Sequence, residues 1–321
     1  MKIGSFMLGW KVLVVSLALY SGAAQAEKVV SDWRPVFLGI DYLTGSETGV
    51  SYPGEVGTRS LAINAMRIAL TNPDIRFFTT PGNGELPRET VGQTTGSFLE
   101  TYNLQVAINA NFFSPCCSTS VENKDLTGLA ISQDSVVSPA DVVSNALAIT
   151  ADNQATIGSI GPTTNLSNIY NAVTGRDLLV TSGAIGVSEV PPDSFSDKNP
   201  RTAVGLSADR SFLYLLTIDG RQPGYSDGAT LFDTAEWLLD LGAYQGLNLD
   251  GGGSTSMTIA RANGDAQYLN RPSGGAPRIN GNNFGVYAAV LAVPEPSTWL
   301  MMVAGMLLVS LANQRRQRDR R

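Results

Sequence analysis

The stretch from Arg201 to Ile259 constrains the fold more than any other part of the chain, because its apolar runs and turn residues alternate in a definite order. "RTAVGLS" and "FLYLLTID" predict two strands joined by the turn "ADRS". The loop "GRQPGYSDG" follows; "LFDTAEWLLDL" then predicts a helix, and "YQGLNLD" predicts a strand ending at Asp250. The order is therefore strand, loop, helix and strand.

The predicted helix also indicates where two carboxylates lie. Thr230 precedes the helix and Asp233 follows three residues later, in the manner of a capping box, and Gly242 ends the helix. A strand–helix–strand connection of this kind is expected to be a right-handed crossover between parallel strands. The two strand ends then meet at one edge of the sheet, so we expect Asp219 and Asp250 to be near neighbours.

The rest of the core is rich in Gly, Ser, Thr and Asn, and its apolar runs are short, so strands are expected to outnumber helices. A strand is predicted over residues 61–70, and the turn "NPD" leads to a second strand over residues 75–80. Residues 93–102 predict a short helix, and "LQVAINANFF", "GLAIS", "ALAIT" and "DLLVTSG" predict further strands. The predicted fold class is α+β, a strand-rich mixed sheet with few helices in a single large domain.

Both ends of the chain look like targeting segments. Residues 1–26 contain two lysines, an apolar run and a closing "AQA", which together predict a signal peptide removed by signal peptidase. Residues 293–321 contain "PEP", an apolar segment over residues 299–312 and five arginines. This tail resembles the PEP-CTERM sorting signal of Gram-negative bacteria, which an exosortase processes and which often accompanies exopolysaccharide production. A plain C-terminal anchor is the alternative, although the apolar segment is short of the roughly 20 residues that span a bilayer.

These segments imply that residues 27–292 form an exported domain. We expect it in the periplasm, on the outer surface or in the extracellular matrix of a Gram-negative bacterium, transiently anchored to the membrane by its C-terminal segment. The domain carries 15 basic and 26 acidic residues, a net charge of −11. Such an acidic surface argues against a nucleic-acid partner, because phosphate backbones require a basic face. A small phosphate held by a few local arginines is not excluded.

The chain contains no histidine. This excludes the Ser-His-Asp and Cys-His relays, the HExxH zinc site and acid/base catalysis by imidazole. Any chemistry must use carboxylates, arginines, amides and hydroxyls, or a hard metal ion bound by oxygen atoms.

The two cysteines of the chain, Cys116 and Cys117, are adjacent. They therefore cannot link distant segments. In an oxidising compartment they could form a vicinal disulfide that rigidifies the surrounding loop. The alternative is a pair of buried thiols without a role.

The sequence "NLDGGGSTSM" places Asp250 directly before Gly251, Gly252 and Gly253. Glycines after a strand let backbone N–H groups approach an anion, although a plain turn is the alternative. The P-loop pattern is absent, since no lysine follows and "STSMTIA" predicts a strand. Together with Asp219, Asp250 makes a carboxylate pair of the kind that cleaves glycosidic bonds without histidine.

Arginines and amides at predicted strand ends are further candidates. Arg201 and Arg278 each follow a proline at a strand entry, where they form a fork for phosphate or carboxylate, or remain solvated surface charges. Asn109 and Asn111 lie at the end of a buried strand. An amide in that position binds a sugar hydroxyl or ties a loop, and the pattern by itself favours the loop.

Four segments occur in the order typical of the phosphodiester glycosidase family: "AINANFF", "PRTAVGL", "LLTIDGRQPGYSDGATLFDTAEWLLDLGAYQGLNLDGGGSTSM" and "PRINGNNFGVY". The chain resembles that family from about Leu61 to Ala292. Family members usually have two glycines after the first asparagine; Ala110 and Asn111 stand here, so we expect Asn111 to narrow or re-tune the pocket. The positions that the resemblance marks for function are Asn109, Arg201, Asp219, Arg221, Ser226, Gly228, Asp250, Gly251, Gly252, Gly253, Ser254 and Arg278.

The resemblance implies hydrolysis of a sugar-1-phosphodiester or a related glycosidic linkage, with a carbohydrate or sugar phosphate as substrate. Asp250 and Asp219 are the expected acid/base or nucleophile pair, Arg201 and Arg278 are expected to hold the phosphate, and Arg221 is expected to assist. No cofactor is implied; Ca²⁺ or Mg²⁺ at the carboxylates is a weaker alternative, because no EF-hand-type loop is present. The alternative function is a non-catalytic, surface-retained polysaccharide-binding or matrix protein.

Overall fold

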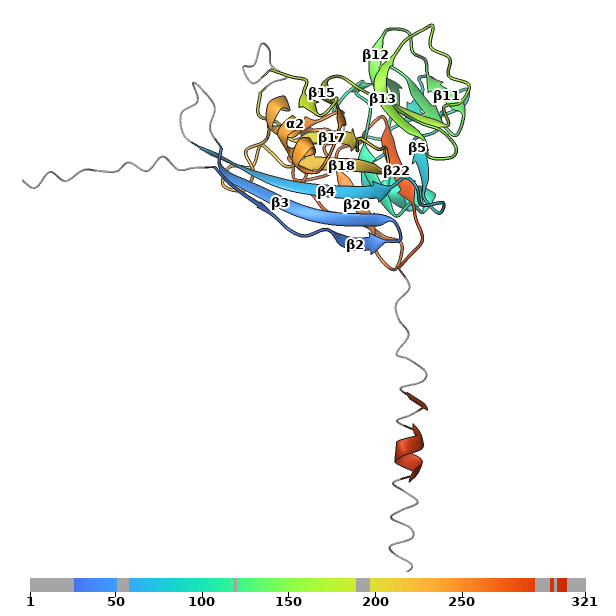
Figure 1. Cartoon of the computed structure of the whole chain (residues 1–321). Helices are drawn as coiled ribbons and strands as arrows, with labels where there is room; N and C mark the ends of the chain where they lie inside the picture. Colours follow the sequence, from blue (N-terminus) through green and yellow to red (C-terminus); the bar gives the residue numbers. More distant parts are fainter. Residues whose placement is uncertain are drawn as a thin grey trace, which may run out of the picture.

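The computed structural model describes residues 26–50, 58–117, 120–188, 197–291, 301–302 and 305–310. Strands dominate these ranges (Figure 1). The helices of the sheet-bearing part are α1 (Thr95–Tyr102), α2 (Leu231–Asp240) and the 3-10 turn η2 (Gly252–Ser254). The prediction of a strand-rich protein with few helices is confirmed. The fold is mostly β rather than clearly α+β, because the described strands form four sheets and the helices among them are few and short.

The largest sheet has nine strands, in the order β1-β3-β4-β18-β17-β19-β15-β16, with β2 paired to β3. Its strands are β1 (Glu27–Val30), β2 (Arg34–Phe37), β3 (Ile40–Val50), β4 (Arg59–Ala69), β15 (Leu178–Thr181), β16 (Ala184–Ile185), β17 (Arg201–Leu206), β18 (Phe212–Ile218) and β19 (Gln245–Asn248). This sheet carries the strands predicted from the most informative stretch of the sequence.

Three smaller sheets complete the described fold. One contains β5 (Arg76–Thr79), β7 (Val106–Asn109), β20 (Met257–Ala260), β21 (Ala266–Tyr268) and β22 (Asn283–Tyr287). Another contains β10 (Ala130–Ser132), β11 (Ser135–Ser138), β12 (Ser144–Ile149), β13 (Ala155–Ile160) and β14 (Asn171–Gly175). A three-stranded sheet contains β6 (Thr90–Val91), β8 (Phe113–Ser114) and β9 (Asn123–Leu126).

The predicted crossover is present, but its two strands are not direct neighbours. β18 and β19 each pair antiparallel with β17, which lies between them, so they run parallel to each other with one strand in between. The predicted mixed sheet is therefore wrong, since every pairing between the described strands is antiparallel. The physical reason is the tight turn between β17 and β18, which makes them a hairpin and places β17 where a parallel neighbour was expected.

The large sheet separates two hydrophobic cores. On one face, Trp237 and Leu238 of α2 pack against residues such as Leu216, and Thr230 and Asp233 form the predicted capping box of α2. On the other face, residues of β4, β17, β18 and β19 pack against strands of the two five-stranded sheets. Both faces of the central strands are buried, which explains their near-continuous apolar sequences.

One local expectation is corrected, namely that the strand after the turn "NPD" returns beside the strand that precedes the turn. β5 does not return beside β4; it pairs with β22 in another sheet, because the turn at residues 71–75 directs the chain away from the large sheet. The predicted signal peptide lies almost wholly in residues outside the described part, as do "PEP" and the arginine tail. Residues 301–302 and 305–310 are helical. In the described ranges, no helix has the length and apolar character needed to span a membrane.

Candidate active site

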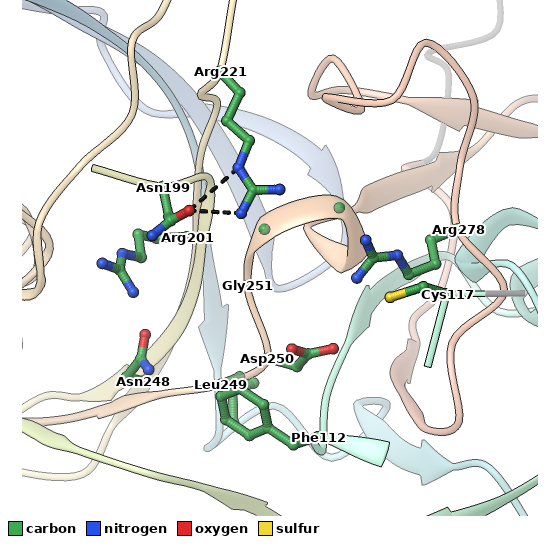
Figure 2. Close-up of a pocket in the computed structure, with 12 residues that line it drawn as sticks. Phe112, Cys117, Asn199, Arg201, Arg221, Asn248, Leu249, Asp250, Gly251 and Arg278 are labelled. Carbon is green, nitrogen blue, oxygen red and sulfur yellow. Dashed lines mark hydrogen bonds between the residues drawn. The ribbon is translucent and has the colours of Figure 1, made fainter. Parts of the chain in front are cut away.

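A cavity of about 350 Å³ lies where the loops after β7 and β19 meet the start of β17. Figure 2 shows the glycine turn after Asp250 crossing its centre, with arginine side chains on both sides of the turn. Its walls are formed by Phe112, Cys117, Asn199, Arg201, Arg221, Asn248, Leu249, Asp250, Gly251, Gly252, Gly253 and Arg278. The segments that converge here are distant in sequence, and the antiparallel order of β18, β17 and β19 brings them to one edge.

The triple glycine is required by its surroundings. Gly252 has a φ of +62°, a conformation that residues with a Cβ rarely adopt. A Cβ on Gly253 would meet Nη2 of Arg278 at 2.2 Å, so only glycine lets this guanidinium lie against the turn. The N–H of Gly252 donates to the carbonyl of Pro200 (2.8 Å) and is not available to a ligand. The glycine turn therefore allows the Arg278 guanidinium to lie close to Asp250, in addition to any contact that its backbone makes with substrate.

Asp250 is the carboxylate of the cavity. Burial raises its pKa to about 6, and this rise is partly offset by a hydrogen bond from Ser254, by the positive charge of Arg278 and by the N–H of Gly251. Its side chain is partly exposed and lines the cavity. A carboxylate with a pKa near the working pH can exchange a proton with a substrate or a water molecule.

Asn109 holds the backbone around Asp250 and does not line the cavity. Its Nδ2 donates to the carbonyl of Asp250 at 2.6 Å, and its Oδ1 accepts from Oγ1 of Thr202 and from N of Ser256. With no exposed surface, it ties β7, β17 and the end of the glycine turn together. The expected substrate-binding role is replaced by a positioning role, in line with the loop-tying alternative.

Two arginines approach the glycine turn from opposite sides (Figure 2). Nη1 of Arg278 donates to Oγ of Ser254 (3.2 Å), beside Asp250. Nε and Nη2 of Arg221 donate to Oδ1 of Asn199 (3.2 and 2.7 Å), and the side chain lines the cavity. Both side chains bring positive charge to the cavity, and the charge of Arg278 acts on the Asp250 carboxylate.

Arg201 lines the cavity but is held by the protein. Its Nε donates to the carbonyl of Ala229 (2.9 Å) and its Nη2 to that of Asp197 (2.6 Å), and only 4% of the residue is exposed. Burial lowers its pKa to about 10, and neighbouring carboxylates, Asp177 first among them, oppose this shift. Arg201 is therefore a largely buried cation in the cavity wall whose guanidinium already donates to backbone carbonyls.

Asp219 does not line the cavity. Its carboxylate accepts from N of Arg271 with both oxygens (3.0 Å each), from Nδ2 of Asn270 (3.1 Å) and from the hydroxyl of Tyr225 (3.0 Å). It is completely buried, and Asp250 is not among the groups that shift its pKa. The expected carboxylate pair is corrected: β17 separates the two strand ends, and the Asp219 carboxylate is enclosed by the segment at residues 270–271.

Three other expected ligands also have structural roles. Ser226 is buried; its Oγ donates to the carbonyl of Asp219 (2.6 Å) and accepts from N of Ala62. Gly228 has a φ of +110° and lies against the backbone of Asn199. Ser254 is buried beside the cavity and contacts it only through Asp250 and Arg278.

The expectation for Asn111 is also corrected. Its Nδ2 donates to the carbonyls of Thr127 and Leu129, and its Oδ1 accepts from N of Thr174 and Nδ2 of Asn282. The side chain is 1% exposed and does not line the cavity. Asn111 joins two sheets and does not narrow the pocket.

Sequence reasoning missed four residues of the cavity wall, Phe112, Asn199, Asn248 and Leu249. Oδ1 of Asn248 is buried and has no hydrogen-bond partner among the described residues, which suits an acceptor for a ligand hydroxyl. A weak signal was available, since Asn248 and Asn199 flank the two quoted motifs "LDGGG" and "PRTAVG". Nothing in the pattern distinguishes Phe112 from an ordinary core residue.

The two cysteines form a vicinal disulfide between Cys116 and Cys117. Both residues are exposed, and Cys117 lines the cavity, so the alternative of two buried thiols is wrong. Among the described residues, no group of three or more Cys, Asp or Glu is placed to hold a metal ion.

The mostly β frame positions the cavity on loops at one sheet edge, a common arrangement for functional sites. One carboxylate with a pKa near 6, beside the guanidinium group of Arg278, is chemically able to exchange a proton with a bound anion or water molecule. The sequence model of the phosphodiester glycosidase family matches residues 102–287, and the chain belongs to that family.

Solved structures share the fold at low sequence identity. The zebrafish N-acetylglucosamine-1-phosphodiester α-N-acetylglucosaminidase catalytic domain, auto-inhibited by its pro-peptide, is 17% identical with a TM-score of 0.60, over 82% of this chain and 88% of that chain. A Synechocystis hypothetical protein is 16% identical (TM-score 0.55; 78% and 62% covered), and a Burkholderia pseudomallei protein is 14% identical (TM-score 0.56; 88% and 100% covered). A comparison with curated protein sequences finds no match.

Proposed function

We propose that this protein hydrolyses the glycosidic bond of a sugar-1-phosphodiester. The observation that carries the proposal is the position of Asp250, whose pKa is raised to about 6 by burial, beside the charge of Arg278 in a cavity that Arg221 also lines. Membership of the phosphodiester glycosidase family supports the same substrate class.

Asp250 acts as a general base. It removes a proton from a water molecule while the water oxygen bonds to C1 of the sugar, and the bond from C1 to the phosphate oxygen breaks. The electron pair of that bond leaves with the phosphate monoester. Arg221 and Arg278 bind the phosphate of the substrate and of the departing monoester alike, because guanidinium groups bind phosphate oxygens with charge-assisted hydrogen bonds.

A single carboxylate is sufficient for this leaving group. An alkoxide leaves only when an acid protonates it, which is why ordinary glycosidases use two carboxyl groups. A phosphate monoester has a second pKa of about 6 and departs as a stable anion without that proton. The enclosed position of Asp219 is therefore compatible with catalysis, and arginines replace the second carboxyl group.

The test compares a sugar-1-phosphodiester with the matching uncharged glycoside. We expect hydrolysis of the phosphodiester, and we expect Arg278→Ala and Arg221→Ala each to raise its KM about 10- to 100-fold, as loss of a hydrogen bond to a charged group does. If each variant hydrolyses the phosphodiester and the uncharged glycoside equally well, the two arginines do not bind phosphate and the phosphodiester is not the preferred substrate. Binding of glycans without any product would instead support the non-catalytic polysaccharide-binding alternative.

The stereochemistry of the product tests the role of Asp250 separately. A general base directs water to the face opposite the leaving group, so the first sugar released has the inverted anomeric configuration. Proton NMR during the first minutes of turnover distinguishes the two anomers. Retention would assign Asp250 as a nucleophile.

The same proposal places the enzyme outside the cytoplasm, since residues 1–26 and 293–321 have the patterns of a signal peptide and a sorting tail. Signal peptidase and an exosortase are its expected partners during export. Mass spectrometry of the mature protein is expected to show an N-terminus near Glu27 and loss of the tail beyond the "PEP" motif. An intact chain recovered from the cytoplasm would contradict this part.

A further inference from the structure

The vicinal disulfide forms one rim of the cavity and touches a substrate-binding arginine. Cys117 is part of the cavity wall, and Sγ of Cys116 accepts a hydrogen bond from Nη1 of Arg278 at 3.7 Å. Figure 2 shows Cys117 beside the Arg278 side chain. The same Nη1 also donates to Oγ of Ser254, which contacts Asp250. Two residues, Arg278 and Ser254, thus connect the disulfide to the reacting carboxylate.

Arg278 depends on these contacts for its position. Among the described residues it forms no ion pair, and its side-chain hydrogen bonds go only to the two atoms named above, Sγ of Cys116 and Oγ of Ser254. Gly253 lets the guanidinium approach the turn but does not bond it. A long side chain with so few partners has considerable rotamer freedom, so one lost contact changes where its charge lies.

The loop that carries the disulfide is fixed by a hydrogen bond from the buried side chain of Lys124. Lys124 has no exposed surface; its Nζ donates to the carbonyl of Pro115 (3.0 Å) and pairs with Glu122 (2.6 Å). Cys117 has a φ of 75°, in the left-handed region that non-glycine residues rarely occupy. The surrounding structure therefore holds the loop in one conformation, and the disulfide lies at its exposed end.

We propose that the Cys116–Cys117 disulfide positions Arg278 for the phosphate of the substrate, and that its reduction lowers substrate affinity without disabling the chemistry of Asp250. This inference rests on the proposed function. Cys116, Cys117 and Lys124 are positioning residues in this scheme, because they act on the substrate through Arg278.

The redox step needs a dithiol as co-reactant. A thiolate of the dithiol attacks one cysteine sulfur, the bond between the two cysteine sulfurs breaks, and a mixed disulfide forms. The second thiol of the reductant then attacks that mixed disulfide. The products are two protein thiols and the oxidised, cyclic disulfide of the reductant, so two electrons and two protons pass to the protein.

The experiment is simplified by composition, since these are the only two cysteines of the chain and a reductant has one target. Kinetics on a sugar-1-phosphodiester are measured before and after dithiothreitol, and again after reoxidation. We expect KM to rise about tenfold on reduction, which corresponds to about 1.4 kcal/mol, with kcat changed less than twofold and with recovery on reoxidation. The Cys116→Ser/Cys117→Ser variant is expected to show the high KM and no response to reductant.

Arg278→Ala separates positioning from a general structural effect. If the disulfide acts through Arg278, the reductant leaves the KM of this variant unchanged within twofold. An unchanged KM in the wild-type protein, an equal reductant effect in Arg278→Ala, or unfolding of the reduced protein by circular dichroism would each overturn the proposal.

Binding of inorganic phosphate gives a readout that does not need turnover. Calorimetric titration of the oxidised and reduced protein is expected to show about tenfold weaker phosphate binding after reduction. If no sugar phosphodiester is hydrolysed but this difference is found, the proposed function fails and the positioning role stands. If turnover is found and phosphate affinity is the same in both states, the positioning role fails and the function stands.

Discussion

The ends of β18 and β19 offer the most informative comparison in this molecule. Asp219 directly follows β18 and Asp250 lies two residues after β19; each precedes a glycine, and both lie at the same end of the sheet. Burial raises the pKa of both carboxyl groups. From the sequence the two positions look equivalent.

Their surroundings differ completely. The Asp219 carboxylate accepts hydrogen bonds from three groups, the N–H of Arg271, the amide of Asn270 and the hydroxyl of Tyr225, with no exposed surface. Asp250 faces a cavity and lies close to guanidinium groups. A carboxylate whose lone pairs are already used supports structure, whereas one facing a cavity remains available to water and substrate. The difference lies in the partners and cannot be inferred from the Asp-Gly pair.

The largest expected effect comes from matched amide variants. Asp250→Asn removes the general base, and we expect kcat for a sugar-1-phosphodiester to fall about 10²- to 10⁴-fold. Asp219→Asn keeps the shape of its site, where the amide still accepts from Arg271 and Asn270, so kcat is expected to stay within tenfold of wild type. Steady-state kinetics on both purified variants measure this ratio. Similar losses in the two variants would mean that the carboxylates act as a pair after all.

The same pair of variants is also expected to differ in stability. The pKa of Asp250 is about 6 in the folded protein and about 3.8 unperturbed. The folded state therefore holds the proton more tightly, and ionisation destabilises the fold as pH rises through this window. Asp250→Asn removes that cost, so its melting temperature at pH 7 is expected to equal or exceed that of the wild type. A lower value would show that Asp250 is structural.

Truncation to alanine is expected to reduce the free energy of unfolding more at Asp219 than at Asp250. Asp219→Ala removes the acceptor of the Arg271 N–H and of one N–H of the buried Asn270 amide, and each orphaned donor costs about 1–3 kcal/mol. We expect the free energy of unfolding to fall by about 2–4 kcal/mol, measured by urea denaturation. Asp250→Ala, at a partly exposed site, is the matched control and is expected to lose much less. Equal losses would remove the structural role assigned to Asp219.

Much of this fold follows from local patterns. Apolar runs bounded by turn residues located β17, β18 and β19 within one or two residues, and the capping box located the start of α2. These features depend on neighbours in sequence. The pairing of β17 between β18 and β19, and of β5 with β22, depends on contacts between distant segments, which periodicity does not encode.

The site was predictable to a similar extent. Asp250, the three glycines and the arginines line the cavity, as predicted from the Asp-Gly-Gly-Gly run and from the family motifs. Asn109 and Ser226 lie in the family motifs for a different reason, since they bond the backbone that shapes the cavity. A residue that positions the backbone of a site and a residue that binds substrate can occur in the same sequence motif. Only partners and exposure distinguish them.

The pH dependence of kcat/KM sharpens the comparison further. With Asp250 as base, kcat/KM is expected to fall tenfold per pH unit below about pH 6, because the carboxylate is then protonated. The charge of Arg278 opposes the upward shift of this pKa, so Arg278→Gln is expected to move the acidic limb to higher pH. Asp219→Asn is expected to leave the limb in place. A limb that moves in Asp219→Asn would instead assign the titration to Asp219.

The smallest expected effect concerns Gly253, the glycine that lies against the Arg278 guanidinium. A Cβ on Gly253 meets the Arg278 guanidinium, a flexible group that can shift, so Gly253→Ala is expected to displace the cation while the turn remains intact. We expect KM for the phosphodiester to rise about three- to tenfold, within the range of one weakened charge-assisted hydrogen bond. Gly158→Ala is the matched control, because a Cβ there meets no atom within 4 Å. Should Gly253→Ala lower kcat with KM unchanged, the turn would act on Asp250 and not on Arg278, and the division of labour between carboxylate and cation would need revision.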